Sequence, residues 1–160
     1  MIEIVKANTP EHMEKAREIF LQYARSLDFD LSFQGFNEEL AGLPGDYTPP
    51  AGCLLLAVEK GESMGCVALR KLEEGICEMK RLFLTPEQRG KGVGRLLAEG
   101  VIREAKKLGY NRMRLDTVPS MVSAIRLYQS LGFKEISAYC YNPVPGTKFF
   151  ELQLQPGNPP

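Results

Sequence analysis

The sequence predicts a mixed α/β domain, in which a central mixed sheet of about six to seven strands is flanked by about four helices. Three observations predict this class. A capped helical pattern follows a short first strand, apolar strand-like runs succeed one another through residues 53–84, and a strand–helix–strand unit spans residues 76–117. The hairpins predict antiparallel pairs, and the strand–helix–strand unit predicts a parallel pair.

The N-terminal part contains the first strand and two helices. Residues 2–6 have the pattern of a strand. Thr9 and Pro10 then mark a helix start, as a capping side chain followed by proline at the first helical position. Helical spacing follows at the apolar residues Met13, Ala16, Ile19, Phe20 and Tyr23. A second, short helix is expected near residues 37–41, and the Gly- and Pro-rich residues 42–52 are expected to be loop.

The middle of the chain is predicted to form consecutive strands and a long helix. Residues 53–58 are a continuous apolar run, which is typical of a buried strand, and residues 64–69 form its hairpin partner. A turn at 73–75 leads into a further strand at 76–84. Residues 92–108 have the apolar stripe of an amphipathic helix, and Gly109 fits its C-terminal cap.

The last part adds three strands and one helix. We expect a strand at 112–117, a helix at 120–131 and a strand that begins at 132–136. Residues 149–154 alternate in polarity and are expected to close the sheet. No repeat or linker divides the chain, so residues 1–155 are predicted to be a single domain, with a frayed tail at 156–160.

Bulk composition excludes several function classes. Lys plus Arg (20) equals Asp plus Glu (20), so the basic excess of a nucleic-acid partner is absent. The four cysteines form no C-x-x-C pair and the single histidine is His12, so we expect core thiols and no metal. The N-terminal segment resembles neither a signal peptide nor a membrane span, so a cytoplasmic protein without a membrane partner is expected. The sequence is compatible with a homodimer and does not determine the oligomeric state.

The segment richest in chemistry is a glycine-rich turn at residues 89–95, at the entry to the long helix. Gly90, Gly92 and Gly94 alternate there, and glycine lets the backbone bend and present its N–H groups to a ligand. The first N–H groups of a helix lack internal partners, and the helix dipole favours an anion. With basic residues beside these glycines, the turn predicts a phosphate or diphosphate cradle.

Two other phosphate-binding patterns fit less well. A Walker-type loop needs Ser or Thr after Gly-Lys, whereas Gly92 follows Lys91 here. A dinucleotide fingerprint needs G-x-G-x-x-G directly after the first strand, with an acid further on. Asp116 does end the next strand, but the spacing is G-x-G-x-G and three strands precede it. A dinucleotide-binding enzyme and a purely structural turn stay as alternatives.

This turn resembles the acyl-CoA-binding motif of the GNAT superfamily of N-acetyltransferases. Its pattern, [Gln/Arg]-x-x-Gly-x-[Gly/Ala], is matched by residues 89–94, and residues 124–133 are similar to the family's A-x-x-L-Y-x-x-x-G-F signature. Residues 139–151 resemble a large group of uncharacterised bacterial members. Met121 stands where the family often has Asn, so Ser120 or Ser123 is expected to cap the helix or contact the cofactor instead.

The resemblance implies acetyl-CoA as cofactor and direct transfer of acetyl to a primary amine, of a small molecule or a protein. An acyl-CoA-binding sensor without catalysis is the alternative. The backbone near the end of the strand at 76–84 is expected to pair with the pantetheine arm. The residues expected to bind the cofactor are Leu82, Phe83, Leu84, Arg89, Gly90, Lys91, Gly92, Val93, Gly94, Arg95, Ser123 and Tyr128.

The resemblance also implies catalytic roles. Tyr128 is expected to protonate the departing thiolate, and Glu78 is expected to remove a proton from the amine. A cysteine-linked acetyl is not expected, because no histidine is paired with a cysteine. The acceptor site is expected at residues 33–47 and 139–148, with the substrate-binding residues Tyr139, Tyr141 and Asn142 and negative charge from Glu38, Glu39 and Asp46.

Overall fold

The computed structural model describes residues 1–155, so the predicted frayed tail at 156–160 lies outside the described residues. The helices are α1 (Pro10–Ser26), α2 (Phe36–Ala41), α3 (Val93–Lys107) and α4 (Val122–Ser130). The strands are β1 (Glu3–Lys6), β2 (Cys53–Glu59), β3 (Glu62–Glu73), β4 (Ile76–Leu84), β5 (Arg112–Thr117), β6 (Lys134–Ile136) and β7 (Lys148–Gln153). Short 3-10 turns lie at Ser32–Gln34, Gly45–Tyr47 and Pro86–Gln88. The predicted fold class is confirmed.

All seven strands form one mixed sheet, in the order β1-β2-β3-β4-β5-β7-β6. β4 and β5 are parallel, as predicted, and the other neighbours are antiparallel. The expectation that the last strand closes the sheet is wrong, because β7 lies between β5 and β6, and β6 forms the edge. The buried Phe150, which is 1% exposed, shows that one face of β7 packs on the core, but this burial does not specify the neighbouring strands.

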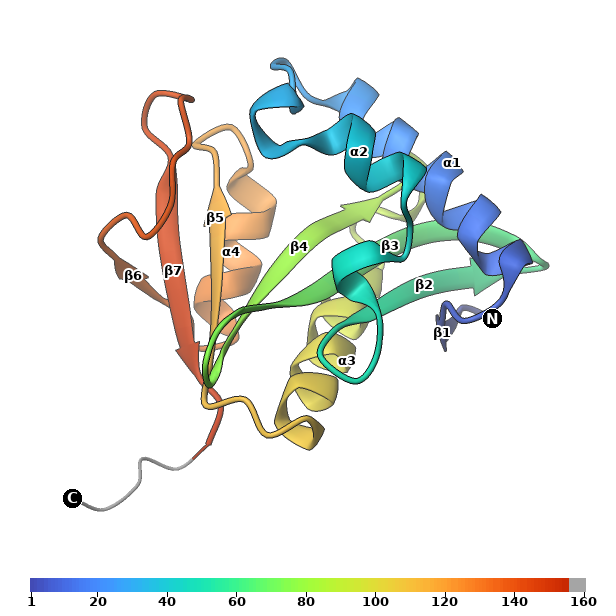
Figure 1. Cartoon of the computed structure of the whole chain (residues 1–160). Helices are drawn as coiled ribbons and strands as arrows, with labels where there is room; N and C mark the ends of the chain where they lie inside the picture. Colours follow the sequence, from blue (N-terminus) through green and yellow to red (C-terminus); the bar gives the residue numbers. More distant parts are fainter. Residues whose placement is uncertain (156–160) are drawn as a thin grey trace.

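Helices cover the two faces of the sheet unequally (Figure 1). α1 and α2 cover one face over β2, β3 and β4 only, whereas α3 and α4 lie against the other face. The face on the α3 side contains the larger apolar core, which includes Leu55, Val67, Leu97, Val101, Met113 and Phe150. The core under α1 and α2 includes Ile19, Phe20, Leu56, Cys66 and Phe83. On the α1 side, no helix of residues 1–155 lies above the β5–β7 part of the sheet (Figure 1).

The helix ends show which local expectations hold. Thr9 Oγ1 accepts a hydrogen bond from the His12 N–H (3.1 Å) and Pro10 begins α1, as predicted. Gly109 follows the end of α3 with a positive φ of 86°, which fits its expected role. The expected serine cap of α4 is wrong, because Met121 is the N-cap and no side chain caps the helix.

β4 and β5 separate after a short stretch of pairing. They pair only from Ile76 and Arg112 to Glu78 and Arg114. Beyond Lys80, β4 contains a bulge, since its register with β3 shifts and Arg81 has a positive φ of 61°. The bulge turns the consecutive side chains of Lys80 and Arg81 toward the same neighbour, the Gln34 amide oxygen. The two strands therefore diverge toward their carboxyl ends, as Figure 1 shows.

Candidate active site

A long groove of about 620 Å³ runs between the end of β4, the start of α3 and the start of α4. It is lined by Tyr23, Ser26, Leu27, Asp28, Leu82, Phe83, Leu84, Arg89, Gly90, Gly92, Gly94, Ser120, Met121, Val122, Ser123, Ala124 and Leu127. Its floor is apolar at Leu82 and Leu84, and one wall is the glycine-rich turn. We call this cavity the long groove.

The glycine-rich turn has the geometry of an anion cradle. Gly90 and Gly92 have φ values of 78° and 81°, which only glycine adopts without strain, and a Cβ at either position would meet no atom within 4 Å. The first backbone bond that enters α3 in the described chain runs from the Leu96 N–H to the Gly92 carbonyl (3.2 Å). The N–H groups before Leu96 therefore have no partner in the helix, and their dipoles favour an anionic group.

The predicted cofactor residues divide into two sets. Those that line the long groove are Leu82, Phe83, Leu84, Arg89, Gly90, Gly92, Gly94 and Ser123. Lys91, Val93 and Arg95 do not line it. Val93 is 3% exposed in the core, and Arg95 donates to Ser130 Oγ (2.6 Å) on the adjacent helix, so their side chains are already engaged. The Arg89 N–H donates to the Pro86 carbonyl (3.3 Å).

Sequence reasoning missed one wall of the groove. The end of α1 and the loop after it supply Tyr23, Ser26, Leu27 and Asp28. These residues carry no local motif, and they are far from the glycine-rich turn in sequence. Only the packing of α1 across β4 brings them there, with the rings of Tyr23 and Phe83 5.7 Å apart.

A second, smaller cavity of about 50 Å³ adjoins the long groove, and the two share Tyr23, Leu82 and Met121. It lies where β4 and β5 diverge. We call it the polar cavity, because its lining includes the charged or polar residues Gln34, Lys80, Arg81, Asp116, Thr117, Tyr128 and Asn142. The remaining lining residues are Phe29, Leu31, Met79, Leu115 and Val118.

Tyr128 lines the polar cavity from α4. It is 7% exposed, and its ring packs 5.7 Å from that of Phe133. Burial raises the pKa of the Tyr128 phenol above its usual value, and the nearby Tyr23 and Asp116 raise it further. The hydroxyl therefore stays protonated at neutral pH, which is the state that a proton donor needs.

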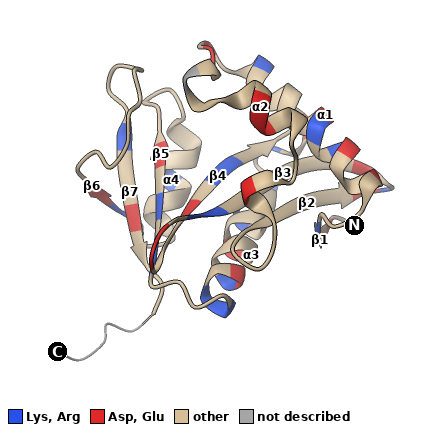
Figure 2. Ribbon diagram, viewed as in Figure 1, with Lys and Arg blue, Asp and Glu red and all other residues tan. Residues whose placement is uncertain are grey.

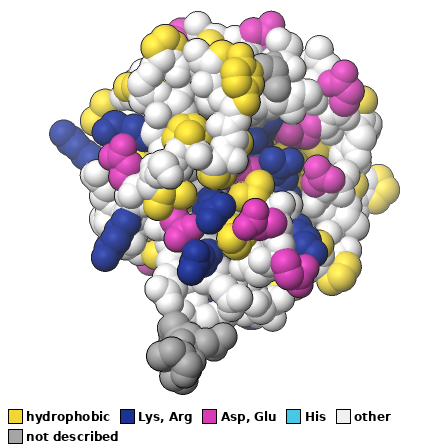
Figure 3. Space-filling model, turned by 60° about the vertical axis from the view of Figure 1, so that its left-hand side comes forward, with side chains coloured by type: hydrophobic (Ala, Val, Ile, Leu, Met, Phe, Trp, Pro, Cys, Tyr) yellow, Lys and Arg dark blue, Asp and Glu magenta, His cyan; other side chains and the backbone are white. Residues whose placement is uncertain are grey.

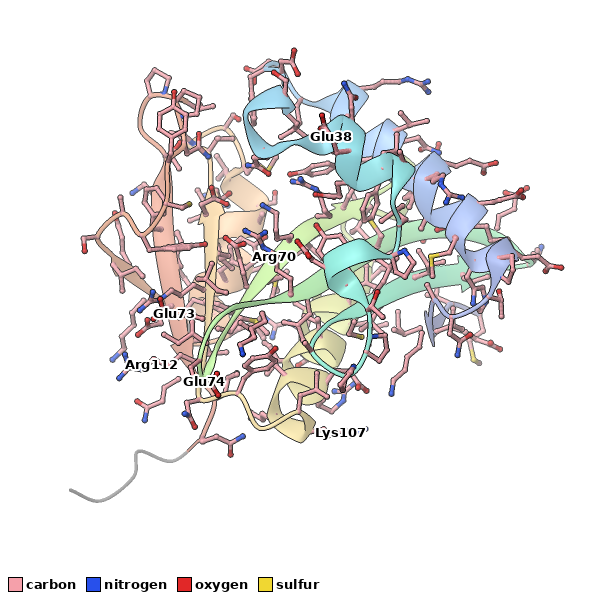
Figure 4. The ribbon with its side chains drawn as sticks, in the orientation of Figure 1. Glu38, Arg70, Glu73, Glu74, Lys107 and Arg112 are labelled. Atoms are coloured by element: carbon pink, nitrogen blue, oxygen red, sulfur yellow. The ribbon has the colours of Figure 1, made fainter. Side chains whose placement is uncertain are left out.

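Glu78 lies outside the lining of both cavities. Its side chain is buried, with Arg70 Nε donating to Oε1 (2.8 Å) and the Tyr139 hydroxyl donating to Oε2 (2.6 Å). Arg70 lies on β3, a few residues before Glu73 and Glu74 at the β3–β4 hairpin (Figure 4). Burial and the Glu78 charge raise the pKa of Tyr139. Both oxygens of this carboxylate are thus occupied by protein donors.

Asp116 is the carboxylate that lines the polar cavity. Its Oδ2 accepts a hydrogen bond from Asn142 Nδ2 (3.0 Å), and Cys140 Sγ lies 3.8 Å from the same oxygen. Among the described residues, no cationic side chain forms an ion pair with it. From the sequence, Asp116 was a candidate only in the dinucleotide alternative. Its place at the end of a predicted strand that is parallel to β4 is the signal for its place in this cavity.

Of the three predicted substrate-binding residues, the structure places only Asn142 in the polar cavity. Tyr139 lies behind it, with its hydroxyl on Glu78 and its ring 5.5 Å from that of Phe149. Tyr141 is 75% exposed and lines neither cavity. The residues near the end of β6 are therefore divided between the cavity wall, the layer behind it and the surface.

The predicted acidic residues mostly face arginines. Glu39 forms two hydrogen bonds with the buried Arg81 guanidinium (both 2.9 Å), and Asp46 lies 3.7 Å from Arg70. Glu38 is exposed on α2 (Figure 4). Arg81 therefore lines the polar cavity with its charge neutralised by Glu39. Lys80 differs, because its Nζ donates only to the neutral amide oxygen of Gln34 (3.0 Å).

Basic and acidic residues both occur on the neighbouring strands β4, β5 and β7 (Figure 2). On the side of the molecule formed by β6 and β7, basic and acidic side chains alternate with apolar ones, so this face carries no single-sign patch (Figure 3). Within residues 1–155, no group of His, Cys, Asp or Glu side chains is arranged to hold a metal. No helix in the same range is long and apolar enough to cross a membrane.

The cysteines are poor nucleophiles in this structure. Cys53, Cys66 and Cys77 are buried in strands, as predicted, and Cys140 is exposed. Burial raises the pKa of Cys53 to about 11. Burial and the Asp116 charge raise the pKa of Cys140 to about 11 as well. All these thiols stay protonated at neutral pH, and the thiolate is the reactive form.

Comparisons with known proteins agree on one family. The model of the acetyltransferase (GNAT) family matches residues 13–133. An uncharacterised N-acetyltransferase of Schizosaccharomyces pombe is 38% identical over 155 residues, which cover 96% of this chain and 95% of that protein. The N-acetylaspartate synthetase of Xenopus tropicalis is 35% identical over 98 residues, but these cover only 61% of this chain and 36% of that protein.

Solved structures show the same fold. A GNAT-family acetyltransferase of Staphylococcus aureus superposes with a TM-score of 0.81 at 22% identity, over 97% of this chain and 100% of that one. YncA of Salmonella typhimurium, solved with its cofactor acetyl-CoA, has a TM-score of 0.72 at 21% identity, over 100% of this chain and 98% of that one. The chain described here therefore belongs to the GNAT family of acetyltransferases and is an N-acetyltransferase.

Proposed function

We propose that this enzyme uses acetyl-CoA and transfers the acetyl group directly to a primary amine. The observation that carries the proposal is the junction of two cavities. The long groove has open helix N–H groups at one end, and it meets the polar cavity at Leu82 and Tyr23. An elongated anionic cofactor fits the groove, and an amine fits a cavity that contains an unpaired carboxylate.

The groove residues suit the parts of acetyl-CoA in order. The N–H groups that precede Leu96 would hold the diphosphate, with Arg89 adding charge. The edge of β4 from Leu82 to Leu84, which has no partner in β5, would pair with the pantetheine arm as an added strand. When bound, acetyl-CoA supplies an activated thioester. The acetyl-CoA complex of YncA, a structural neighbour, supports this assignment.

Two protons have to move as the new C–N bond forms and the C–S bond breaks. The amine loses a proton, and we propose Asp116 as its acceptor, because Asp116 lines the cavity. The role of Glu78 as the base, which the family resemblance implies, stays a prediction. A proton that leaves the amine could reach Glu78 only through Tyr139, whose hydroxyl donates to it. The departing sulfur gains a proton, and Tyr128, which lines the same cavity, is the proposed donor.

The acceptor is an amine in this proposal. The N-acetylaspartate synthetase of Xenopus tropicalis, similar over part of this chain, supports it, since its named product is an N-acetylated amine. An enzyme is favoured over an acyl-CoA sensor, because Tyr128 and Asp116 both line the polar cavity beside the groove.

An acceptor screen tests the proposal. The protein is mixed with acetyl-CoA and a panel of amines while free thiol is followed. We expect thiol release with at least one class of amine and a melting shift with coenzyme A. Coenzyme A binding without thiol release for any amine would favour the sensor, and a melting shift with NAD alone would favour a dinucleotide enzyme.

A further inference from the structure

The polar cavity contains one cation and one anion that protein partners leave without an ion pair. These are Lys80 from β4 and Asp116 from β5. The other charged side chain in the lining, Arg81, is neutralised by Glu39 (2.9 Å). Both residues are half-buried. A charge that is partly removed from water without an ion-pair partner is costly, so a ligand that pairs with both would lower the cost at each.

The hydrogen-bond partner of the Lys80 ammonium group is a neutral amide and not a carboxylate. Its Nζ donates to Gln34 Oε1 (3.0 Å), and the same oxygen accepts from Arg81 Nη1 (2.8 Å). Within the described chain no carboxylate forms an ion pair with Lys80. Burial lowers the pKa of this ammonium group, and the nearby Arg81 and Arg70 lower it further, against the opposite effect of Glu78 and Asp116.

The opposite wall carries acceptors and an unused hydroxyl. Asp116 Oδ2 is held by the Asn142 amide (3.0 Å), which orients the carboxylate without neutralising it. Thr117 also lines the cavity, is 6% exposed, and has a buried Oγ1 with no hydrogen-bond partner among residues 1–155. The volume of about 50 Å³ has room for a few non-hydrogen atoms, such as a carboxylate and the adjacent amine, and not for a long chain.

We propose that the acceptor is a free α-amino acid, whose carboxylate pairs with Lys80 and whose amine lies against Asp116. This inference rests on the proposed function and names its substrate class. The amine would then lie near Tyr128, whose pKa already responds to the Asp116 charge. A diamine would bring a second cation, and a protein lysine would bring no carboxylate beside its amine. In either case Lys80 would have no ion-pair partner.

The test compares matched acceptors. Acetylation of each L-amino acid is measured beside its α-carboxamide, which keeps the amine and lacks the carboxylate. We expect kcat/KM for the preferred amino acid to exceed that of its amide by about 10–100-fold, the range for a charge-assisted hydrogen bond. Lys80→Met should abolish this preference. Gln34 keeps its donor from Arg81 in that variant, so the fold is retained.

A matched control and a second readout keep the test sharp. Lys71→Met removes a lysine of β3 that pairs with Glu74 (3.0 Å) and lines neither cavity, so it should leave the preference intact. Calorimetry of amino-acid binding to the coenzyme A complex reports on Lys80 without turnover. Amides acetylated as well as acids, with no effect of Lys80→Met, would overturn the inference while the proposed function stands. Absence of thiol release with every amine would instead overturn the proposed function.

Discussion

The long groove and the polar cavity are adjacent, yet they are built in opposite ways. The groove takes much of its wall from two segments, 82–94 and 120–127, and the backbone N–H groups proposed to bind the cofactor lie at Gly92 and after it. The polar cavity takes residues 79–82 from β4 and residues 115–118 from the end of β5, and it adds single side chains from α1, the segment after α1, α4 and the loop after β6. The groove is therefore a local structure that a short motif encodes, whereas the cavity exists only in the folded chain.

The two sites also handle charge differently. Helix N–H groups attract an anion with partial charges that cost little to leave exposed. The cavity instead holds full charges on Lys80 and Asp116, which need a partner of opposite sign when buried. If the proposed function is right, the groove would hold the same cofactor for every acceptor, and the charges in the cavity would determine which acceptor binds.

The largest effect should come from the carboxylate of the polar cavity. Asp116→Asn removes the proposed proton acceptor, so kcat/KM should fall by about 10²–10⁴-fold, the usual range for a general base. Glu78→Gln should reduce kcat/KM by less than about tenfold and lower Tm, because Arg70 loses its charged partner. Steady-state kinetics and thermal denaturation measure both variants. An equal kinetic loss in Glu78→Gln, with unchanged Tm, would return the role of base to Glu78.

The next effect concerns Tyr128, which lines the polar cavity. Tyr128→Phe keeps the ring packed on Phe133 and removes the proposed proton donor. We expect kcat to fall by roughly 10²-fold while the affinity for coenzyme A is unchanged. Tyr110→Phe is the control, since its hydroxyl donates to the Ala51 carbonyl (2.6 Å) and it lines neither cavity. Unchanged turnover in Tyr128→Phe would exclude this role.

The smallest effect should be confined to the groove. Gly92→Ala forces a side chain into a φ of 81°, a strain of about 1–2 kcal/mol that displaces the cradle and weakens coenzyme A binding by about tenfold. Gly61→Ala is matched, with a φ of 78° and open space around its Cβ, but it lies in the β2–β3 hairpin. Both should lose similar stability in thermal denaturation. Equal affinity losses in calorimetry would show that Gly92 acts through stability alone.

Much of the fold could be predicted, because its signals are local. The cap at Thr9, the glycine after α3 and the apolar run of β2 each specify their own element. The position of β7 in the sheet could not be predicted. Alternating polarity shows that a strand has one buried face, but it does not show which strands lie beside it. The prediction that a serine caps α4 was wrong for a similar reason. Ser120 and Ser123 both have a suitable side chain, but residue type does not determine at which residue the helix begins, and Met121 is the N-cap.

The site divides in the same way. The motif located the turn at Gly90 and Gly92. The side chains of Val93 and Arg95 pack or pair elsewhere, so only their backbone N–H groups stay predicted to bind the cofactor. Lys80 went unrecognised, because its orientation depends on the bulge at Arg81, and a single inserted residue has no clear sequence signal. Residues whose role depends on tertiary neighbours need the structure.

The parting of β4 from β5 leaves a strand edge open inside the molecule. Such an edge normally invites another chain, and proteins protect it by covering it. Here the protection would come from a metabolite, which completes the sheet each time it binds and leaves it incomplete after each turnover. The resistance of the protein to unfolding would then rise and fall with the supply of its own cofactor.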